Sequence, residues 1–365
     1  MLILSNHVHD IVTQIKEHVK ENCALIAIGE NIKIEIPELI DALNKANISF
    51  IGGIFPKVIA QSNTYEKGIV VTPLYNVKKI FTIQEISKKS FTIPNIAFNS
   101  DKEYSLITYV DGLTAHISNY LSKLYENYGM KTNYFGGGAG SLSLVQQPCV
   151  FSKDGFFEDA AIACILEMKS SIGVKHGWKK LNGPFIVNKA NTNTVEEINW
   201  EHPFTIYKDI VEKDAKQTFN DSNFFDIAKG YPLGIIKQGL DIVIRDPLTV
   251  NANNELVCVG EVEENTLINI MKGDACSLIN AAVEATEESI SKAQNPKTAF
   301  VIDCISRVLY LENDFEKEIQ NVSKTIQNKF PDIDINGALT LGEISSYGNG
   351  FIEFYNKTIV VSLFE

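Results

Sequence analysis

The residues best placed to do chemistry lie near the C-terminus, in the stretch Asp303-Cys304-Ile305-Ser306-Arg307. An apolar run at 299–302 precedes it and a helical pattern over 305–326 follows, so Cys304 stands where a predicted strand gives way to a predicted helix. A helix N-terminus lowers the pKa of a thiol, whereas Asp303 opposes that effect. No histidine lies nearby in the sequence to act as a base. Contact with a ligand or a structural role is therefore favoured for Cys304, and a cysteine-dependent enzyme that uses it is the alternative.

Two arginines and a glutamate could complete a site around this thiol. Arg307 follows Cys304 by about one helical turn, Glu343 ends the second strand of the same unit, and Arg245 ends an apolar strand. A guanidinium can bind a carboxylate or phosphate through two parallel hydrogen bonds. It can equally form an internal ion pair, for Arg245 with Asp246 or Glu343, that holds two repeats in register. For Arg307 we predict an ion pair with Glu343 or another nearby acid, beside a pocket.

A glycine-rich run, Gly136 to Gly140, resembles a loop that cradles an anion, but it lacks the Lys-Ser/Thr ending of a nucleotide-binding P-loop. The run therefore predicts either a pocket wall or close packing of backbone against a neighbouring repeat. We place the ligand site between the two halves of the chain, on strand-end loops. The predicted ligand-binding residues are Gly137, Gly138, Arg245, Cys304, Arg307 and Glu343.

The histidines do not have the spacing of a zinc site, and we predict no metal and no cofactor. A haem needs only one axial ligand, and His176, beside Gly177-Trp178, is the best candidate for that role. The alternative for His176 is an ordinary histidine that is hydrogen-bonded or exposed.

The elements that must position these residues repeat three times. Strand, helix and strand patterns ending in glycine occur near residues 25–71, 106–165 and 299–364, with second strands predicted to end at Gly53, Gly138 and Gly342. A Gly-rich turn follows the last of these. The predicted fold class is α/β to α+β: mixed β-sheets covered by helices, in two pseudo-related halves built from repeated β-α-β units.

The segments between the repeats carry further signals. We predict a helix over 8–20, a strand over 77–83, paired strands over 184–187 and 195–198, and a helix over 204–215. Pro247 is predicted to end the strand before it, and Asp274 to cap a helix that runs to about 294. The division between halves is drawn near Glu201-His202-Pro203, which gives domains of residues 1–202 and 203–365.

Composition limits the class of protein. The 365 residues carry a net charge of −12, which argues against a nucleic-acid partner and against an anionic membrane surface. No apolar run reaches the roughly 18 residues that a membrane-spanning helix needs, and no export signal is recognisable at the start. The six cysteines are scattered through strand and helix patterns. Such a distribution is typical of reduced, buried thiols, and it predicts a cytoplasmic protein.

The order and spacing of several motifs resemble the FIST sensory domain family, in its N-terminal and C-terminal parts, from about residue 23 to 363. In the first part the resemblance rests on Phe50-Ile51-Gly52-Gly53, Phe135 to Gly140, Gly155 and Ala160-Ala161-Ile162. In the second it rests on Tyr231-Pro232-Leu233-Gly234, Arg245-Asp246-Pro247, Gly260-Glu261-Val262, Asp303 to Arg307 and Gly342-Glu343-Ile344. Two positions where the family often has glycine carry Ser306 and Asn265 instead, and Asn tolerates the backbone of such a turn.

The resemblance implies an intracellular sensory protein that binds a small ligand, such as an amino acid. It also implies that residues 1–202 form the N-terminal FIST domain and residues 203–365 the C-terminal one. Because the chain carries no kinase or cyclase pattern, the signal would pass to a separate protein such as a histidine kinase or a chemotaxis component. One branch of the family binds haem and senses nitric oxide, so a haem-binding sensor that uses His176 is an alternative function. The leading prediction is a ligand sensor without catalysis.

Overall fold

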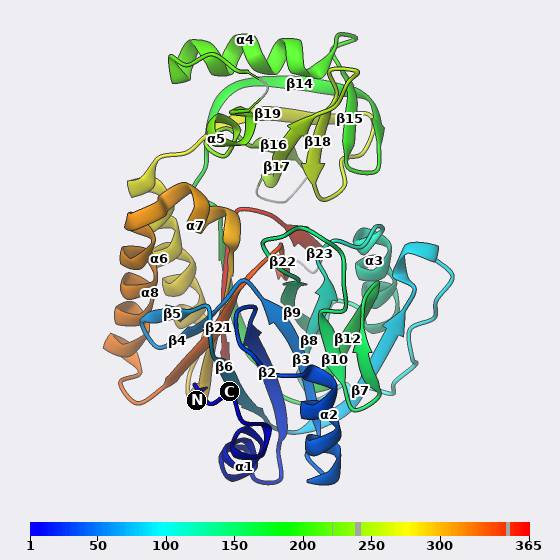
Figure 1. Ribbon diagram of the computed structural model, residues 1–365, viewed down its shortest axis with the longest axis vertical. Coiled ribbons are helices and arrows are strands. Elements are labelled where there is room, and N and C mark those ends of the chain that lie inside the picture. Colours follow the sequence, from blue (N-terminus) through cyan, green and yellow to red (C-terminus); the bar gives the residue numbers. More distant parts are fainter. Residues whose placement is uncertain (221, 238–241, 348–350) are drawn as a thin grey trace.

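A computed structural model describes residues 1–220, 222–237, 242–347 and 351–365. It contains a β-barrel that stands on a larger body of mixed sheets and helices (Figure 1). These mixed sheets and covering helices confirm the predicted fold class. The Gly-rich turn predicted after Glu343 falls on residues 348–350, outside the described residues. In the part of the chain that the structure describes, every helix is too short or too polar to cross a bilayer.

The body contains the same unit three times: a strand, a helical segment, a parallel strand, a hairpin and an antiparallel return strand. The first unit comprises β2 (Cys23–Gly29), α2 (Ile36–Lys45), β3 (Phe50–Phe55), β4 (Lys57–Ala60), β5 (Asn63–Tyr65) and β6 (Ile69–Leu74). The second comprises β8 (Tyr104–Asp111), α3 (Ile117–Tyr128), β9 (Thr132–Ala139), β10 (Val150–Ser152), β11 (Gly155–Phe157) and β12 (Ala160–Leu166). The third comprises β20 (Thr298–Cys304), α7 (Ile305–Leu311), η2 (Glu312–Asp314), α8 (Phe315–Lys329), β21 (Asp334–Thr340), β22 (Glu343–Tyr347), β23 (Phe351–Tyr355) and β24 (Ile359–Phe364).

Strand pairing within the units follows the predicted β-α-β pattern. The first two strands of each unit are parallel neighbours, β2 with β3, β8 with β9 and β20 with β21. The predicted strand ends are not equivalent, however. Gly53 and Gly138 lie inside their strands, paired with Ala27 and Val110, whereas Gly342 lies between β21 and β22 with a φ of +148°. The prediction was wrong here because each glycine is required by a close contact at its own position, and the three do not belong to one shared kind of turn.

Each unit also sends its hairpin into the sheet of another unit. The hairpin β4–β5 pairs with β21, β10–β11 pairs with β3, and β22–β23 pairs with β9. Every sheet of the body therefore contains strands from two units, and the exchange closes a cycle. Residues far apart in the sequence, such as Lys57 and Leu339, become direct neighbours through this pairing.

The core follows from the alternation of side chains along these strands. In β20, Phe300 and Ile302 face a central core shared by all three sheets, whereas Ala299 and Val301 face the helical layer outside. Each outer face is covered by its own helices, which are α1 (Val8–Val19) with α2, α3, and α6 (Ala275–Lys292) with α8 (Figure 1). The predicted cap of α6 is confirmed, because the Asp274 carboxylate accepts a hydrogen bond from the Ser277 N–H at 2.8 Å.

The remaining elements of the body extend the edges of its sheets. They are β1 (Leu2–Ile3) beside β6, β7 (Val77–Gln84) beside β12, and β13 (Ser170–Lys175) beside β24. A short helix, η1 (Ile86–Lys88), follows β7.

The barrel is inserted between β13 and α6, and helices α4 (Pro203–Ala215) and α5 (Phe224–Ala228) pack on it. Its strands, in the order in which they pair, are β14 (Lys179–Asn191), β15 (Thr194–Ile198), β18 (Leu256–Val259), β17 (Val243–Val250), β16 (Leu233–Ile236) and β19 (Thr266–Lys272). The expectation that Pro247 ends its strand was wrong. β17 continues to Val250, because the register shifts between Pro247 and Thr249 and the proline sits at that irregularity. The predicted division at 202/203 falls inside this part, between β15 and α4, and stays a prediction.

Candidate functional site

A cavity of about 760 Å³ lies between the barrel and the body. The barrel side contributes residues 192–193, Arg245, Leu248 and 258–261. The body side contributes residues 112–115 and 117–118 after β8, residues 304–306 and Leu309 at the end of β20 and in α7, and residues 353–354 and Asn356 at the end of β23. In Figure 1, α7, β23 and the start of α3 lie on the part of the body that faces the barrel. The cavity therefore opens at the C-terminal ends of β8 and β20, the edge where α/β proteins commonly bind ligands.

Most of the cavity wall is apolar, and part of that apolar wall reaches the surface. Leu113, Ile117 and Leu309 line it from the body, and Leu248 lines it from the barrel. Leu142 and Leu144, on the loop between β9 and β10, also line it and are 43% and 49% exposed. Ligand pockets are typically concave and mainly apolar, with a few placed polar groups. The cavity has this character.

Arg245 lines the cavity, but its hydrogen bonds join the barrel to the body. Its Nε donates to the Glu261 carbonyl at 2.8 Å, and its Nη1 donates to the carbonyl of Phe354 at 2.9 Å. Its Nη2 pairs with the Glu353 carboxylate at 3.2 Å. Arg245 is buried, with 4% of its surface exposed. The internal ion pair foreseen for Arg245 therefore forms, with Glu353 in place of Asp246 or Glu343.

Cys304 lines the cavity, and Glu343 lies directly behind it. The Cys304 thiol donates a hydrogen bond to the Glu343 carboxyl group, which also accepts from Thr340 Oγ1 at 3.1 Å and from the Thr358 N–H at 3.2 Å. Burial raises the pKa of Glu343 to about 8. Burial, and then the negative charge of Glu343, raise the pKa of the Cys304 thiol well above its ordinary value. At neutral pH the side chain of Cys304 is therefore a protonated thiol.

Arg307 is fully buried behind the cavity wall and does not line it. Its guanidinium forms two hydrogen bonds with the Glu318 carboxylate, at 3.0 and 2.6 Å, and its Nε lies 3.2 Å from Asp303 Oδ1. Nη1 donates to the His176 carbonyl at 2.7 Å and Nη2 to the Leu278 carbonyl at 3.0 Å. The predicted partner was Glu343 or another nearby acid, and the structure gives Glu318 and Asp303. Arg307 thus ties α7, α8 and α6 together under the site.

Gly137 and Gly138 also lie outside the cavity wall, packed against the third unit. A Cβ atom on Gly137 would lie 2.7 Å from Thr340 Cγ2. One on Gly138 would lie 3.4 Å from the carbonyl carbon of Leu341 in the third unit, and 2.9 Å from the Cα of Gly112 in its own unit. The Gly138 N–H donates to the Gly342 carbonyl at 2.7 Å. Of the two readings of this glycine-rich run, close packing between repeats is the one that the geometry supports.

The sequence-predicted residues thus divide into three groups. Arg245 and Cys304 line the cavity, Glu343 contacts Cys304 from behind, and Arg307, Gly137 and Gly138 support the elements that carry them. Their roles in binding stay predictions.

Asn356 is the notable lining residue that the sequence did not indicate. It follows β23, is 1% exposed, and has neither side-chain polar atom hydrogen-bonded to another of the described residues. An asparagine between strands is ordinarily interpreted as a turn residue, so its type and position gave no signal of a site.

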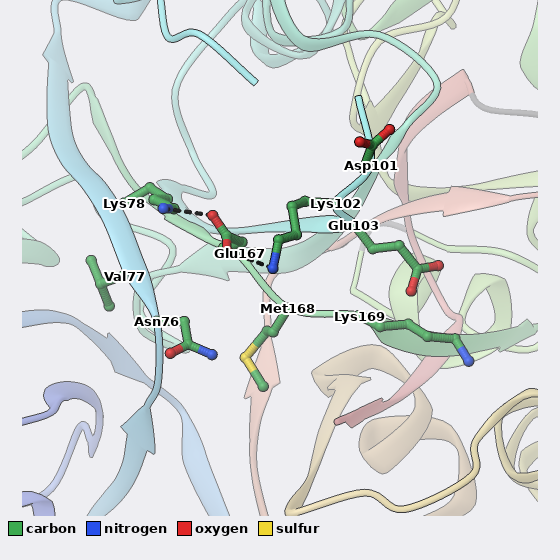
Figure 2. Close-up of a pocket in the computed structure, with 9 residues that line it drawn as sticks. All are labelled: Asn76, Val77, Lys78, Asp101, Lys102, Glu103, Glu167, Met168 and Lys169. Atoms are coloured by element: carbon green, nitrogen blue, oxygen red, sulfur yellow. Dashed lines mark ion pairs between the residues drawn. The ribbon is translucent and has the colours of Figure 1, made fainter. Parts of the chain in front are cut away.

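A second hollow of about 580 Å³ lies on the surface beside β7 and is shown in Figure 2. It is lined by charged side chains that already pair with one another. Glu167 lies between Lys78, at 2.5 Å, and Lys102, at 3.5 Å. A polar groove of this kind matches the character of a ligand pocket less well than the apolar cavity does.

His176 stands apart from the cavity, in a hollow of about 380 Å³ beside the start of α6. Its Nδ1 accepts a hydrogen bond from the Trp178 N–H at 2.9 Å. Haem binding through His176 stays an untested alternative. Among residues 1–220, 222–237, 242–347 and 351–365, no group of three or more His, Cys, Asp or Glu side chains could hold a metal ion.

Comparison with known proteins gives two matches that together cover nearly the whole chain. The family model of the FIST N domain matches residues 23–201, and that of the FIST C domain matches residues 203–346. No curated protein matches the chain.

Proposed function

The chain belongs to the FIST family of sensory domains, and on that premise we propose that it binds a small ligand in the cavity between the barrel and the body. The observation that carries the proposal is the shared wall of this cavity. A ligand there touches the barrel and two of the repeated units at once. A ligand that binds one arrangement of these parts better than another shifts the population toward it, which is how a binding event becomes a signal.

The state of Cys304 supports binding rather than nucleophilic catalysis. The thiolate is the reactive form of cysteine, and burial beside Glu343 raises the pKa of this thiol. Within the proposal, Arg245 and Cys304 contact the ligand. Glu343 fixes Cys304, Arg307 fixes α7, and Gly137 and Gly138 let the second and third units pack closely.

We further propose a cytoplasmic location and a separate output protein, such as a histidine kinase or a chemotaxis component. All six cysteines are free thiols, as expected in a reducing compartment. In the same proposal, residues 1–202 and 203–365 are the two FIST domains, which meet inside the barrel.

The proposal is tested by native mass spectrometry of the protein purified without added ligand. Leu309→Trp places a larger side chain in the cavity wall, and Leu4→Trp is the matched control at an exposed leucine that follows β1 and does not line the cavity. We expect a retained small molecule in the natural protein and in Leu4→Trp, and its loss in Leu309→Trp. Equal retention by both variants would move the binding site elsewhere.

A further inference from the structure

The side-chain amide of Asn356 is buried at the cavity wall without a hydrogen-bond partner. Its Nδ2 and Oδ1 atoms are both unpaired in the described part of the chain, and the residue is 1% exposed. The backbone is held in place, because the Asn356 carbonyl accepts a hydrogen bond from Thr358 Oγ1 at 2.9 Å. Leaving a buried donor and acceptor unpaired destabilises a folded protein, so such groups usually have a partner. A ligand in the cavity can supply one.

Gly260, at the end of β18, packs closely against this amide. A Cβ atom on Gly260 would lie 3.0 Å from Asn356 Oδ1 and 3.1 Å from Arg245 Nε. The φ of Gly260 is +79°, a conformation that side-chain-bearing residues rarely adopt. Gly260 also lines the cavity. The barrel therefore approaches the amide through a residue without a side chain, and a larger residue at 260 would collide with Asn356 and Arg245.

The charges around the cavity disfavour an anionic ligand. Among the described lining residues, the charged side chains are one guanidinium, of Arg245, and two carboxylates, of Glu261 and Glu353. Three of the Arg245 contacts described above are to protein acceptors, so it has little capacity left for a ligand carboxylate. An anion placed here would meet two carboxylates and one guanidinium whose donors are already in use.

Each of the two carboxylates has at least one partner within the protein. Glu353 pairs with Arg245 and Lys237. Glu261 accepts a hydrogen bond from Ser118, and its second oxygen lies 3.4 Å from His116 Nδ1. Among the described lining residues, the buried polar side-chain atoms without a hydrogen-bond partner are Glu261 Oε1 and the two atoms of the Asn356 amide. The amide needs a donor and an acceptor together, and neither an amine nor a carboxylate supplies both.

We propose that the ligand is an uncharged molecule with an apolar body and an adjacent hydrogen-bond donor and acceptor, as in a carboxamide, lactam or cyclic imide. Asn356 is the residue that determines this specificity. A side-chain amide presents C=O and NH2 side by side, so it can pair with a carboxamide edge through two hydrogen bonds. This inference rests on the proposed function, since it concerns the same cavity.

The ligand class is tested by ligand-observed NMR with matched sets of probes. Each set places a carboxamide, a carboxylate or an amine on the same apolar body, such as indole-3-acetamide, indole-3-acetate and tryptamine. A probe counts as a cavity binder when its binding is lost in Leu309→Trp and kept in Leu4→Trp. We expect the carboxamide of a set to bind at least about tenfold more tightly than its two partners, because a site with a buried amide discriminates against a ligand that leaves it unpaired.

Asn356→Leu tests the residue. We expect this variant to lose the preference for carboxamides and to bind the carboxamide probe at least about tenfold more weakly. Its melting temperature should not fall, because an unpaired buried amide has been removed. A purely structural asparagine would instead lower the melting temperature. Asn356→Asp, which keeps the shape and removes the donor, should lose the same preference if the leucine variant does not fold. The control is Asn269→Leu, at a buried asparagine of β19 away from the cavity wall.

The outcomes separate the two proposals. Cavity binders that are mainly carboxylates or amines would overturn the ligand class and leave the proposed function standing. A carboxamide preference that survives in both Asn356 variants would overturn the role of Asn356. If no probe binding depends on Leu309, both this inference and the proposed cavity site are wrong.

Discussion

The buried carboxyl group of Glu343 makes stability depend on pH in a direction that can be measured. Its pKa is raised from an ordinary 4.5 to about 8, chiefly by burial. Between these two pH values the folded protein holds a proton at Glu343 that the unfolded chain has released. Folded protein therefore binds more protons than unfolded protein, and the free energy of unfolding falls as the pH rises through this window.

The size of the effect follows from the pKa difference. Each tenfold step in proton affinity is worth about 1.4 kcal/mol, so full ionisation of a group whose pKa moves from 4.5 to about 8 lowers stability by roughly 5 kcal/mol. Between pH 5 and pH 8 the same group lowers stability by roughly 3 to 4 kcal/mol. Glu343→Gln removes the titration and keeps a side chain that can accept from the Thr358 N–H.

The assay is urea unfolding followed by far-UV circular dichroism at pH 5, 6.5 and 8. We expect Glu343→Gln to be no more stable than the natural protein at pH 5 and clearly more stable at pH 8. Glu316→Gln, at an exposed position on α8, is the control and should follow the natural protein at each pH. A difference between natural protein and Glu343→Gln that stays constant from pH 5 to pH 8 would refute a proton held at this site.

Three further predictions concern Arg307, the cysteines and His176. Arg307→Ala should lower the free energy of unfolding by about 3–5 kcal/mol and weaken cavity binding, since it leaves the buried Glu318 and Asp303 without their cation. Lys317→Ala, on the exposed face of α8, is the control and should change neither quantity appreciably. Equal effects in the two variants would contradict the structural role of the ion pairs of Arg307. In the folded protein one thiol, that of the exposed Cys276, should react rapidly with a disulfide reagent. Cys276→Ser should abolish this fast phase. Rapid reaction of Cys304 would instead favour a thiol enzyme. Incubation with hemin should give no specific Soret band, and a sharp band lost in His176→Ala would favour the haem-sensor alternative.

The repeated units could be predicted from the sequence because their information is local. Alternating apolar residues, a helix of suitable length and a following strand specify a β-α-β unit without reference to distant residues. The exchange of hairpins could not be predicted, since it depends on pairs such as Lys57 with Leu339. Closure of the barrel could not be predicted from the sequence for a related reason. β14 runs through two register shifts, which break the regular alternation that identifies a strand.

The candidate site was predictable in part. Cys304 and Arg245 could be placed at strand ends, and both line the cavity. The partner of Arg307 could not be identified, because the predicted continuous helix over 305–326 breaks at η2, where Glu312 has a φ of +50°. That break brings Glu318 of α8 back to the guanidinium. The sequence gives no sign of it, since Glu318 resembles any other acid on a helix.

Hydrogen–deuterium exchange tests most directly whether a ligand binds between the barrel and the body. The protein is compared with and without the dialysable fraction of a cell extract. We expect slower exchange at the same time in residues 112–118, 258–261 and 304–309, which come from both sides of the cavity, and no such change in Leu309→Trp. Protection confined to the charged hollow of Figure 2, around residues 76–78 and 101–103, or no protection at the cavity, would contradict it.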